Sequence, residues 1–137
     1  MCPENFAAKD CQLLAQAMDA RANAYCPYSE FAVGAAVRRV DGRVYAAANV
    51  ENASLGLSVC AERNAIATAV ADGMRPGELE AVAVIADTKT PIVPCGACLQ
   101  VIAEFAAESC LIITETMQEK EVGAWDLADL LPERFSL

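Results

Sequence analysis

Three cysteines and one glutamate have the types and the spacing of a zinc-assisted hydrolytic site. Cys95 and Cys98 belong to the sequence Pro-Cys-Gly-Ala-Cys at the start of an apolar run, so both thiols fall on one face of the first helical turn. Alone, this pair is equally consistent with a redox dithiol or with two thiols packed in an apolar interior. Cys60 supplies a third sulfur at the start of another helical pattern, and Glu62 follows it. Three sulfur ligands leave the fourth tetrahedral position of zinc free for water, as in catalytic zinc sites.

Glu62 is the candidate proton-transfer group. It is too close in sequence to Cys60 to bind the same ion comfortably, but it is well placed to contact a zinc-bound water. The chain contains no histidine, which excludes an imidazole base, a Ser–His or Cys–His couple and a histidine metal ligand. A carboxylate must therefore carry the proton. The helix dipole alone also favours an acid in a first turn, but the position of Glu62 between the zinc cysteines favours the catalytic role.

Arg63, next to the acid, is a candidate support for the thiolates. A zinc ion with three thiolates carries a net negative charge, so acidifying its water requires further positive charge. The N-termini of the two helices supply part of it, and hydrogen bonds from Arg63 to the sulfurs can supply the rest. A solvated charge on the helix surface is an equally acceptable interpretation of Arg63.

Size and charge limit the class of partner. The chain of 137 residues is most economically a single domain, 1–137. Its net charge of -9 would repel a phosphate backbone, so nucleic acid is not an expected partner. The N-terminus lacks the residue order of a signal peptide, and no uncharged apolar run reaches about eighteen residues. We therefore expect a cytoplasmic protein that does not bind membranes.

The remaining cysteines are expected to stay reduced. There are seven in all, an odd number, and a reducing compartment argues against a disulfide framework. With three assigned to the metal, Cys2, Cys11, Cys26 and Cys110 are expected to be small buried hydrophobes or surface thiols.

Apolar periodicity predicts the elements that must position the site. Helices are expected over 5–24, 61–71, 98–108 and 126–131, and strands over 31–40, 43–48, 79–86, 110–114 and 119–123. The last two strands are separated by only about four or five residues, too few for a parallel crossover, so they should be antiparallel. We expect an α/β fold with a five-stranded mixed sheet and helices on both faces. The apolar fraction of 55% favours self-association.

A polar loop over residues 49–54 comes just before the Cys60 helix. Asn49 and Glu51 within it read as turn residues when considered alone. Beside a metal site, the same two side chains become candidate binders of substrate hydroxyl groups.

At this point the chain resembles a cytidine deaminase of the small, single-domain, homotetrameric type. The order Cys-x-Glu and then Pro-Cys-x-x-Cys is a signature of zinc deaminases of nucleosides and nucleobases. The resemblance spans nearly the whole chain and is carried by the segments 25–36, 49–54, 60–63, 94–98 and 130–132 with Phe135. It implies the three-layer α/β/α fold of that family.

The resemblance also implies roles for individual residues. One zinc ion per subunit is bound by the three cysteines, and Phe31 packs on the pyrimidine. Asn49 and Glu51 hold the sugar hydroxyls, and Ala61 belongs to the same substrate-binding set. A neighbouring subunit completes the active site, with Phe135 as its candidate contribution.

Two positions depart from the family pattern. Leu55 stands where a tyrosine is common, which leaves open a detail of the subunit contact or the pocket wall. Leu99 stands where an arginine is common, which removes a charge near the thiolates.

The expected reaction is hydrolytic deamination of cytidine and 2'-deoxycytidine to uridine and 2'-deoxyuridine, with release of ammonia, in pyrimidine salvage. Zinc lowers the pKa of its water, Glu62 accepts that proton, and attack occurs at C4 of the base. Glu62 then delivers protons to N3 and to the departing amino group.

Three alternatives remain. A deaminase of a modified cytosine nucleoside or an aminonucleoside antibiotic would share the zinc motifs, although Asn49 and Glu51 favour an ordinary nucleoside. A non-catalytic zinc module that binds nucleosides would have no use for Glu62. The acidic charge and the missing crossover helix disfavour a deaminase of polynucleotides.

Overall fold

One mixed sheet organises the molecule. The computed structural model describes residues 2–137, and within them five strands form a single sheet. The β3–β4 pair is parallel and the other neighbouring pairs are antiparallel. Across the sheet the order is β2 (Val44–Ala48), β1 (Val33–Arg39), β3 (Leu79–Ala86), β4 (Ala106–Thr116) and β5 (Val122–Asp126).

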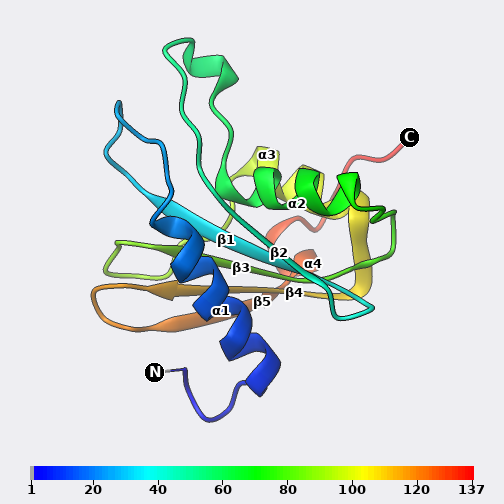
Figure 1. Ribbon diagram of the computed structural model, residues 1–137. Coiled ribbons are helices and arrows are strands. Elements are labelled where there is room, and N and C mark those ends of the chain that lie inside the picture. Colours follow the sequence, from blue (N-terminus) through cyan, green and yellow to red (C-terminus); the bar gives the residue numbers. More distant parts are fainter. Residues whose placement is uncertain (1) are drawn as a thin grey trace.

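Helices cover both faces of this sheet (Figure 1). Helix α1 (Ala8–Arg21) lies across one face, and helices α2 (Ala61–Ala71) and α3 (Gly96–Phe105) lie on the other. The short helix α4 (Leu127–Leu130) follows β5, and a single 3-10 turn, η1 (Leu55–Leu57), sits in a segment that projects from the sheet. The three-layer α/β/α arrangement with an antiparallel last strand is as predicted.

The central strand β3 shows how the sequence divides its side chains between the two helical layers. Val82 and Val84 pack in the core beneath α2 and α3, whereas Ala81, Ala83 and Ile85 pack beneath α1. Successive strand side chains point to opposite faces, so an uninterrupted apolar run fills both cores. Small alanines on the α1 side let that helix approach the sheet closely.

Element bounds follow the sequence prediction where local pattern and packing agree. Helix α2 and strand β3 occupy the predicted ranges 61–71 and 79–86, and the last strand is shifted to Val122–Asp126. The predicted helix over 98–108 is wrong at its C-terminal end. It stops at Phe105 because residue 106 already pairs with Leu79 of β3, and this tertiary pairing overrides the helical preference of an alanine-rich sequence.

One cysteine expectation is wrong. Cys2 and Cys11 form a disulfide, although both were expected to remain thiols. The expectation came from the assumed compartment, whereas the fold places their Cα atoms 5.5 Å apart, within bridging distance. The bond ties the segment before α1 to that helix. Cys26 and Cys110 are free thiols, the first partly exposed and the second buried.

Charged side chains join helix α1 to the sheet at the end of the strands away from the projecting segments. The buried Arg38 of β1 pairs with Asp10 of α1 at 2.8 Å and also with Glu80 of β3. The Arg38 guanidinium holds the pKa of Glu80 below its usual value. This pairing compensates the desolvation of Arg38 and fixes α1 against two strands.

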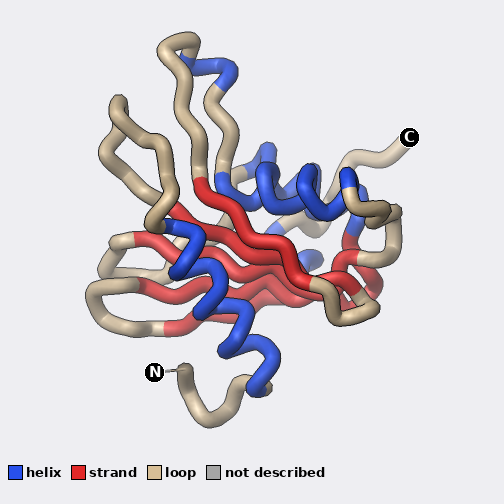
Figure 2. Tube along the Cα trace, in the orientation of Figure 1, coloured by secondary structure: helices blue, strands red, loops and turns tan. Residues whose placement is uncertain are grey.

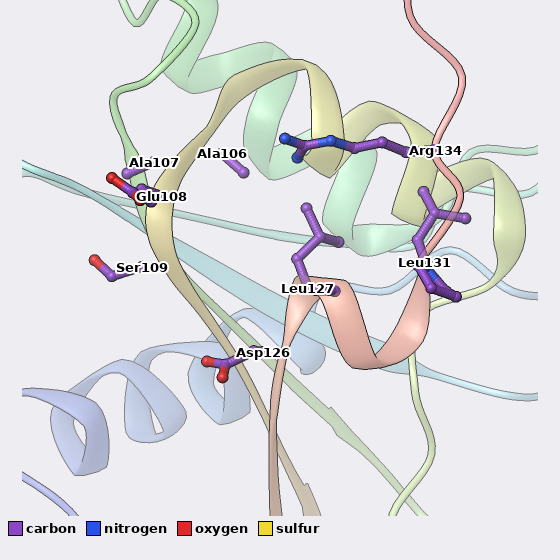
Figure 3. A pocket seen from close by; sticks show the side chains of 10 residues that line it. Ala106, Ala107, Glu108, Ser109, Asp126, Leu127, Leu131 and Arg134 are labelled. Atoms are coloured by element: carbon purple, nitrogen blue, oxygen red, sulfur yellow. The ribbon is translucent and has the colours of Figure 1, made fainter.

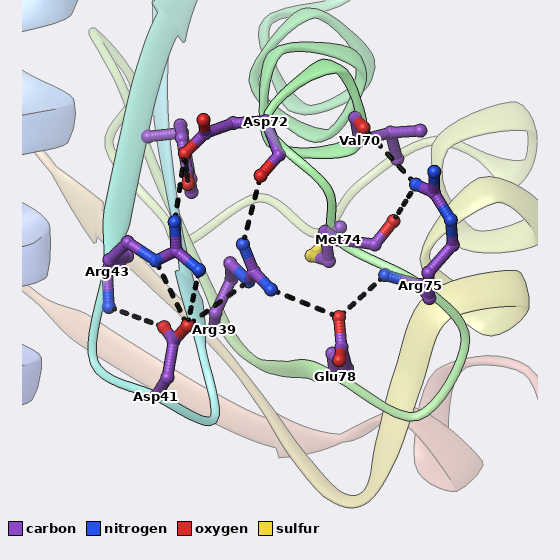
Figure 4. Close-up of polar contacts among 9 residues, drawn as sticks. Arg39, Asp41, Arg43, Val70, Asp72, Met74, Arg75 and Glu78 are labelled. Carbon is purple, nitrogen blue, oxygen red and sulfur yellow. Dashed lines mark hydrogen bonds and ion pairs between the residues drawn. The ribbon is translucent and has the colours of Figure 1, made fainter.

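A second charged network closes the β1–β2 hairpin. Figure 4 shows Arg39 between Asp41 and Glu78, with Arg43 joining Asp41 to Asp72. It connects the hairpin to the end of α2. Both networks consist of paired opposite charges, which is the arrangement of a structural contact.

The close contact of α1 with β1 at Gly34 gives a stability prediction. A Cβ at Gly34 would lie 1.9 Å from the Ala17 carbonyl oxygen, which belongs to the helix backbone and cannot turn aside. We expect Gly34→Ala to lower the free energy of unfolding by at least about 2 kcal/mol. Gly56→Ala is the control, because among residues 2–137 no atom outside Gly56 and its two chain neighbours lies within 4 Å of its Cβ position. Chemical denaturation of both variants measures the effect, and equal midpoints would contradict the contact.

Candidate zinc site and adjoining pocket

Three sulfur atoms converge where two helices begin. Cys60 is the residue before α2, Cys95 is the residue before α3, and Cys98 lies in the first turn of α3. Their Sγ atoms all lie within 4.8 Å of one another, and the Cys60–Cys95 distance is 3.9 Å. The structure thus brings together the three cysteines that the sequence singled out.

The donor set fits a zinc ion. Zn–S bonds of about 2.3 Å in a tetrahedron separate the sulfurs by about 3.8 Å, close to the observed spacing. Cys98 is fully buried, Cys60 is half-buried and Cys95 is exposed, so the cluster is closed on one side and open on the other. An open side is what distinguishes a catalytic zinc site from a closed structural one.

The cysteines differ in their electrostatic surroundings. Burial raises the pKa of the Cys98 thiol, and the negative charges of Glu62 and Cys60 act in the same direction. Burial also acts to raise the pKa of Cys95, but hydrogen bonds from N–H groups at the start of α3 and from the Cys98 and Cys60 thiols outweigh it, and the net pKa is lowered. The helix N-terminus therefore favours thiolate at its own cap, and a cation is needed to favour it at Cys98.

Glu62 lies against this cluster. Its side chain is buried, 6% exposed, in the first turn of α2. The Cys98 thiol donates to its Oε2 at 3.5 Å. Burial raises the pKa of this carboxyl group. A carboxyl group with a raised pKa can both accept and return a proton near neutral pH.

Arg63 contacts the sulfurs instead of extending into solvent. Its Nη2 donates to Cys60 Sγ at 3.6 Å, and contacts to the Cys60 and Cys98 sulfurs raise the pKa of the guanidinium. Among the residues described, its buried Nε has no hydrogen-bond partner. The geometry thus favours the thiolate contact over the surface-charge interpretation.

A pocket of about 360 Å³ opens beside the cluster. It is lined by Cys60, Glu62 and Cys95 and by every residue that the family resemblance assigns to substrate in the same chain: Phe31, Asn49, Glu51 and Ala61. The sequence reasoning missed four lining residues, Ser29, Val33, Ile92 and Val93. The first two lie in the recognised segment 25–36, and the other two directly precede Pro94, so proximity to the motifs was the available signal.

Asn49 and Glu51 shape the pocket as well as line it. Asn49 Oδ1 accepts from the Val33 N–H at 2.9 Å, and its Nδ2 donates to the Phe31 carbonyl at 2.9 Å. Glu51 accepts three hydrogen bonds from Tyr28 and Ser29. The Ser29 hydroxyl is the largest cause of a lowered pKa of Glu51. Asn49 and Glu51 therefore act as turn residues and also line the pocket, and their binding of substrate hydroxyls stays a prediction.

Three other predicted positions lie outside this pocket. Phe135 is 68% exposed, and its carbonyl accepts from Gln100 on α3. Leu55 is 73% exposed in the projecting segment. Leu99 packs into the core beneath α2 and α3, so at this position an apolar contact takes the place of the charge that the family pattern suggests.

A larger pocket of about 720 Å³ lies beyond the opposite end of α3 (Figure 3). Glu108, Asp126 and Arg134 give it a mixed charge, and Leu127 and Leu131 line it further. Its lining includes none of the cysteines or the buried carboxyl group described above. Size alone therefore does not identify the candidate site.

Comparisons with known proteins agree with this geometry. A model of the cytidine and deoxycytidylate deaminase zinc-binding region matches residues 7–114. The cytidine deaminase of Sporosarcina psychrophila is 44% identical over 125 residues, which cover 91% of this chain and 90% of the relative. That of Mycobacterium tuberculosis H37Rv is 40% identical over 125 residues, covering 91% and 88%.

Solved structures give the same result. The cytidine deaminase of Burkholderia pseudomallei matches with a TM-score of 0.86 and 48% identity, covering 90% of this chain and 97% of that one. The enzyme of Mycobacterium tuberculosis matches with a TM-score of 0.79 and 37% identity, covering 96% and 100%. These matches confirm the predicted fold, and with the family model they show that this chain belongs to the zinc-binding cytidine and deoxycytidylate deaminase family.

Proposed function

We propose that the protein acts as a single-domain, zinc-dependent cytidine deaminase. The reaction converts cytidine and 2'-deoxycytidine, with one water, to uridine and 2'-deoxyuridine, with release of ammonia. One observation carries the proposal: a buried carboxyl group, Glu62, lies against a three-cysteine cluster at the wall of a pocket. The relatives named above, which are cytidine deaminases, support the choice of substrate.

Cys60, Cys95 and Cys98 are the proposed ligands of one zinc ion per chain. A zinc ion in such a site supplies positive charge and lowers the pKa of water, which provides a nucleophile at neutral pH. Arg63 and the two helix N-termini offset the charge of the thiolates.

Glu62 is the proposed proton carrier. Its carboxylate accepts a proton from the attacking water and delivers it to N3 of the base, as attack at C4 removes the ring's double bond there. The same carboxyl group then takes the proton of the new C4 hydroxyl and passes it to the 4-amino group, so that the C4=O bond forms as the C4–N bond breaks and ammonia leaves. Burial raises the pKa of Glu62, and that shift suits a group which must hold the proton between the two steps.

The remaining pocket residues are proposed to bind and orient the nucleoside. Phe31 supplies an aromatic surface for the pyrimidine, and Ala61, as the first residue of α2, offers a backbone N–H that has no intrahelical acceptor. Asn49 and Glu51 face the same pocket and are the proposed partners of the sugar hydroxyls.

We also propose that the chain forms a homo-oligomer, most economically a tetramer, in which a neighbour completes the site. Leu55, Leu57 and Phe135 are 73%, 66% and 68% exposed, which favours their burial against another copy. Light scattering measures the assembled mass, and a monomer at working concentration would contradict this.

Within residues 2–137, no helix has the length and apolar character to cross a membrane. A cytoplasmic role in pyrimidine salvage is part of the proposal, and cell fractionation tests the location.

The reaction is tested by incubating zinc-loaded protein with cytidine, 2'-deoxycytidine and free cytosine and separating the products by chromatography. We expect conversion of both nucleosides and little conversion of the free base, because the base alone cannot use Asn49 and Glu51. Absence of any conversion, with zinc present, would contradict the proposal and favour a modified cytosine nucleoside or an aminonucleoside as substrate.

Replacing the proposed proton carrier should separate chemistry from folding. We expect Glu62→Gln to keep the fold and the zinc content but to lose turnover by about 10²- to 10⁴-fold, because an amide cannot relay the proton. Glu119→Gln, at an exposed position in the turn before β5, should keep wild-type turnover. Single-turnover measurements give the rate of the chemical step in both variants. A Glu62→Gln enzyme with wild-type turnover would refute the role of Glu62 as proton carrier.

Replacing a proposed ligand should instead remove the metal. We expect Cys95→Ala to lose zinc and to be less stable, since metal binding contributes to folding. Cys26→Ala removes a free thiol outside the cluster and should keep one zinc per chain. Elemental analysis of the purified proteins gives the stoichiometry, and a fully zinc-loaded Cys95→Ala protein would exclude Cys95 as a ligand.

A further inference from the structure

The segment from Tyr28 to Phe31 forms one wall of the pocket without belonging to a helix or a strand. Glu30 within it has φ of 56°, a left-handed conformation that is uncommon for a residue with a side chain. Such a conformation persists only where surrounding contacts fix it. The contacts that hold this segment therefore also determine where Phe31 lies.

The Glu30 N–H donates to the Cys26 carbonyl, and Asn49 Nδ2 donates to the Phe31 carbonyl. The carboxylate of Glu51 provides the other side-chain contacts to this segment. Its Oε1 accepts from the Tyr28 N–H at 3.0 Å and from the Ser29 N–H at 3.1 Å. Its Oε2 accepts from the Ser29 hydroxyl. The Ser29 Oγ in turn accepts from the Phe31 N–H at 3.1 Å. The Ser29 hydroxyl thus links the carboxylate of Glu51, the proposed partner of the sugar hydroxyls, to the backbone of Phe31.

The acceptor capacity of Glu51 makes this connection relevant to substrate. A carboxylate has about four acceptor positions, and Tyr28 and Ser29 use three of them. The remaining position is on Oε2, the oxygen that the Ser29 hydroxyl already contacts. A sugar hydroxyl that donates to Glu51 would therefore share this oxygen with Ser29.

We propose that Ser29 is a positioning residue that couples sugar binding at Glu51 to the placement of Phe31 on the base. This inference rests on the proposed function. Without the hydroxyl, the two backbone N–H groups still hold the segment to Oε1, so the fold is kept. The Phe31 N–H then loses its acceptor and Oε2 loses a fixed donor, which leaves both ends of the substrate site less well ordered.

The test compares Ser29→Ala and Ser29→Thr with wild-type enzyme and with Ser109→Ala, an exposed serine on β4 outside this pocket. A hydrogen bond to a charged group is worth a factor of about 10 to 100 in an equilibrium constant. We expect Ser29→Ala to raise KM for cytidine by about 10-fold with little change in kcat. Ser29→Thr keeps the hydroxyl and should restore most of the affinity. Thermal melting should be unchanged in Ser29→Thr and Ser109→Ala and should change little in Ser29→Ala, because the lost hydrogen bonds are exposed and two backbone N–H groups still bind Glu51.

A double-mutant cycle distinguishes coupling from a purely structural role. In a Glu51→Gln background, Ser29→Ala should raise KM by much less than in the wild type, because the two residues act through the same hydrogen bond. Independent, additive effects would overturn the proposal, as would an unchanged KM in Ser29→Ala or a loss confined to kcat.

A wild-type enzyme that fails to deaminate cytidine would overturn the proposed function and this inference with it. Wild-type turnover with an unaffected Ser29→Ala variant would overturn this inference alone.

Discussion

The mutual repulsion of four acidic groups in a small, partly buried volume is the constraint on which the rest of the structure depends. Cys60, Cys95, Cys98 and Glu62 cannot all carry charge there unless positive charge is placed among them. The chain meets this demand with two helix N-termini and the guanidinium of Arg63, and the zinc ion proposed for this cluster would complete the compensation. Because no histidine is available, sulfur and carboxylate must carry all of this chemistry.

The sheet supplies the geometry that this charge arrangement requires. The parallel β3–β4 pair is joined by α3, so that helix begins at the same end of the sheet as the carboxyl end of β3 (Figures 1 and 2). Helix α2 packs beside α3 on the same face and begins near the same end. Two loops, 25–32 and 49–60, project from this end and are joined by the hydrogen bonds of Glu51.

Much of the fold, and the residues that meet at the candidate site, could be predicted because their signals are local. Helix α2 has clear apolar periodicity and ends at Ala71, two residues before Gly73, whose φ of 100° is incompatible with a continuing helix. The zinc motifs are short and specific. The start of β4 could not be predicted, since pairing with Leu79 depends on a residue distant in sequence. The disulfide of Cys2 and the hydrogen bonds of Ser29 likewise depend on what the fold brings near.

Helix α1 contributes no residue to the lining of the pocket, yet its position bears on the shape of the pocket. At the C-terminal end of α1, Arg21 Nε donates to the Ala32 carbonyl at 2.9 Å. The backbone of α1 also packs closely against Gly34, at Ala17 and Arg21. These contacts fix the start of β1, which begins two residues after Phe31. Designed changes of base specificity therefore need not begin with residues that line the pocket. A small change in the packing of α1, on the other face of the sheet, would shift the start of β1 and Phe31 with it.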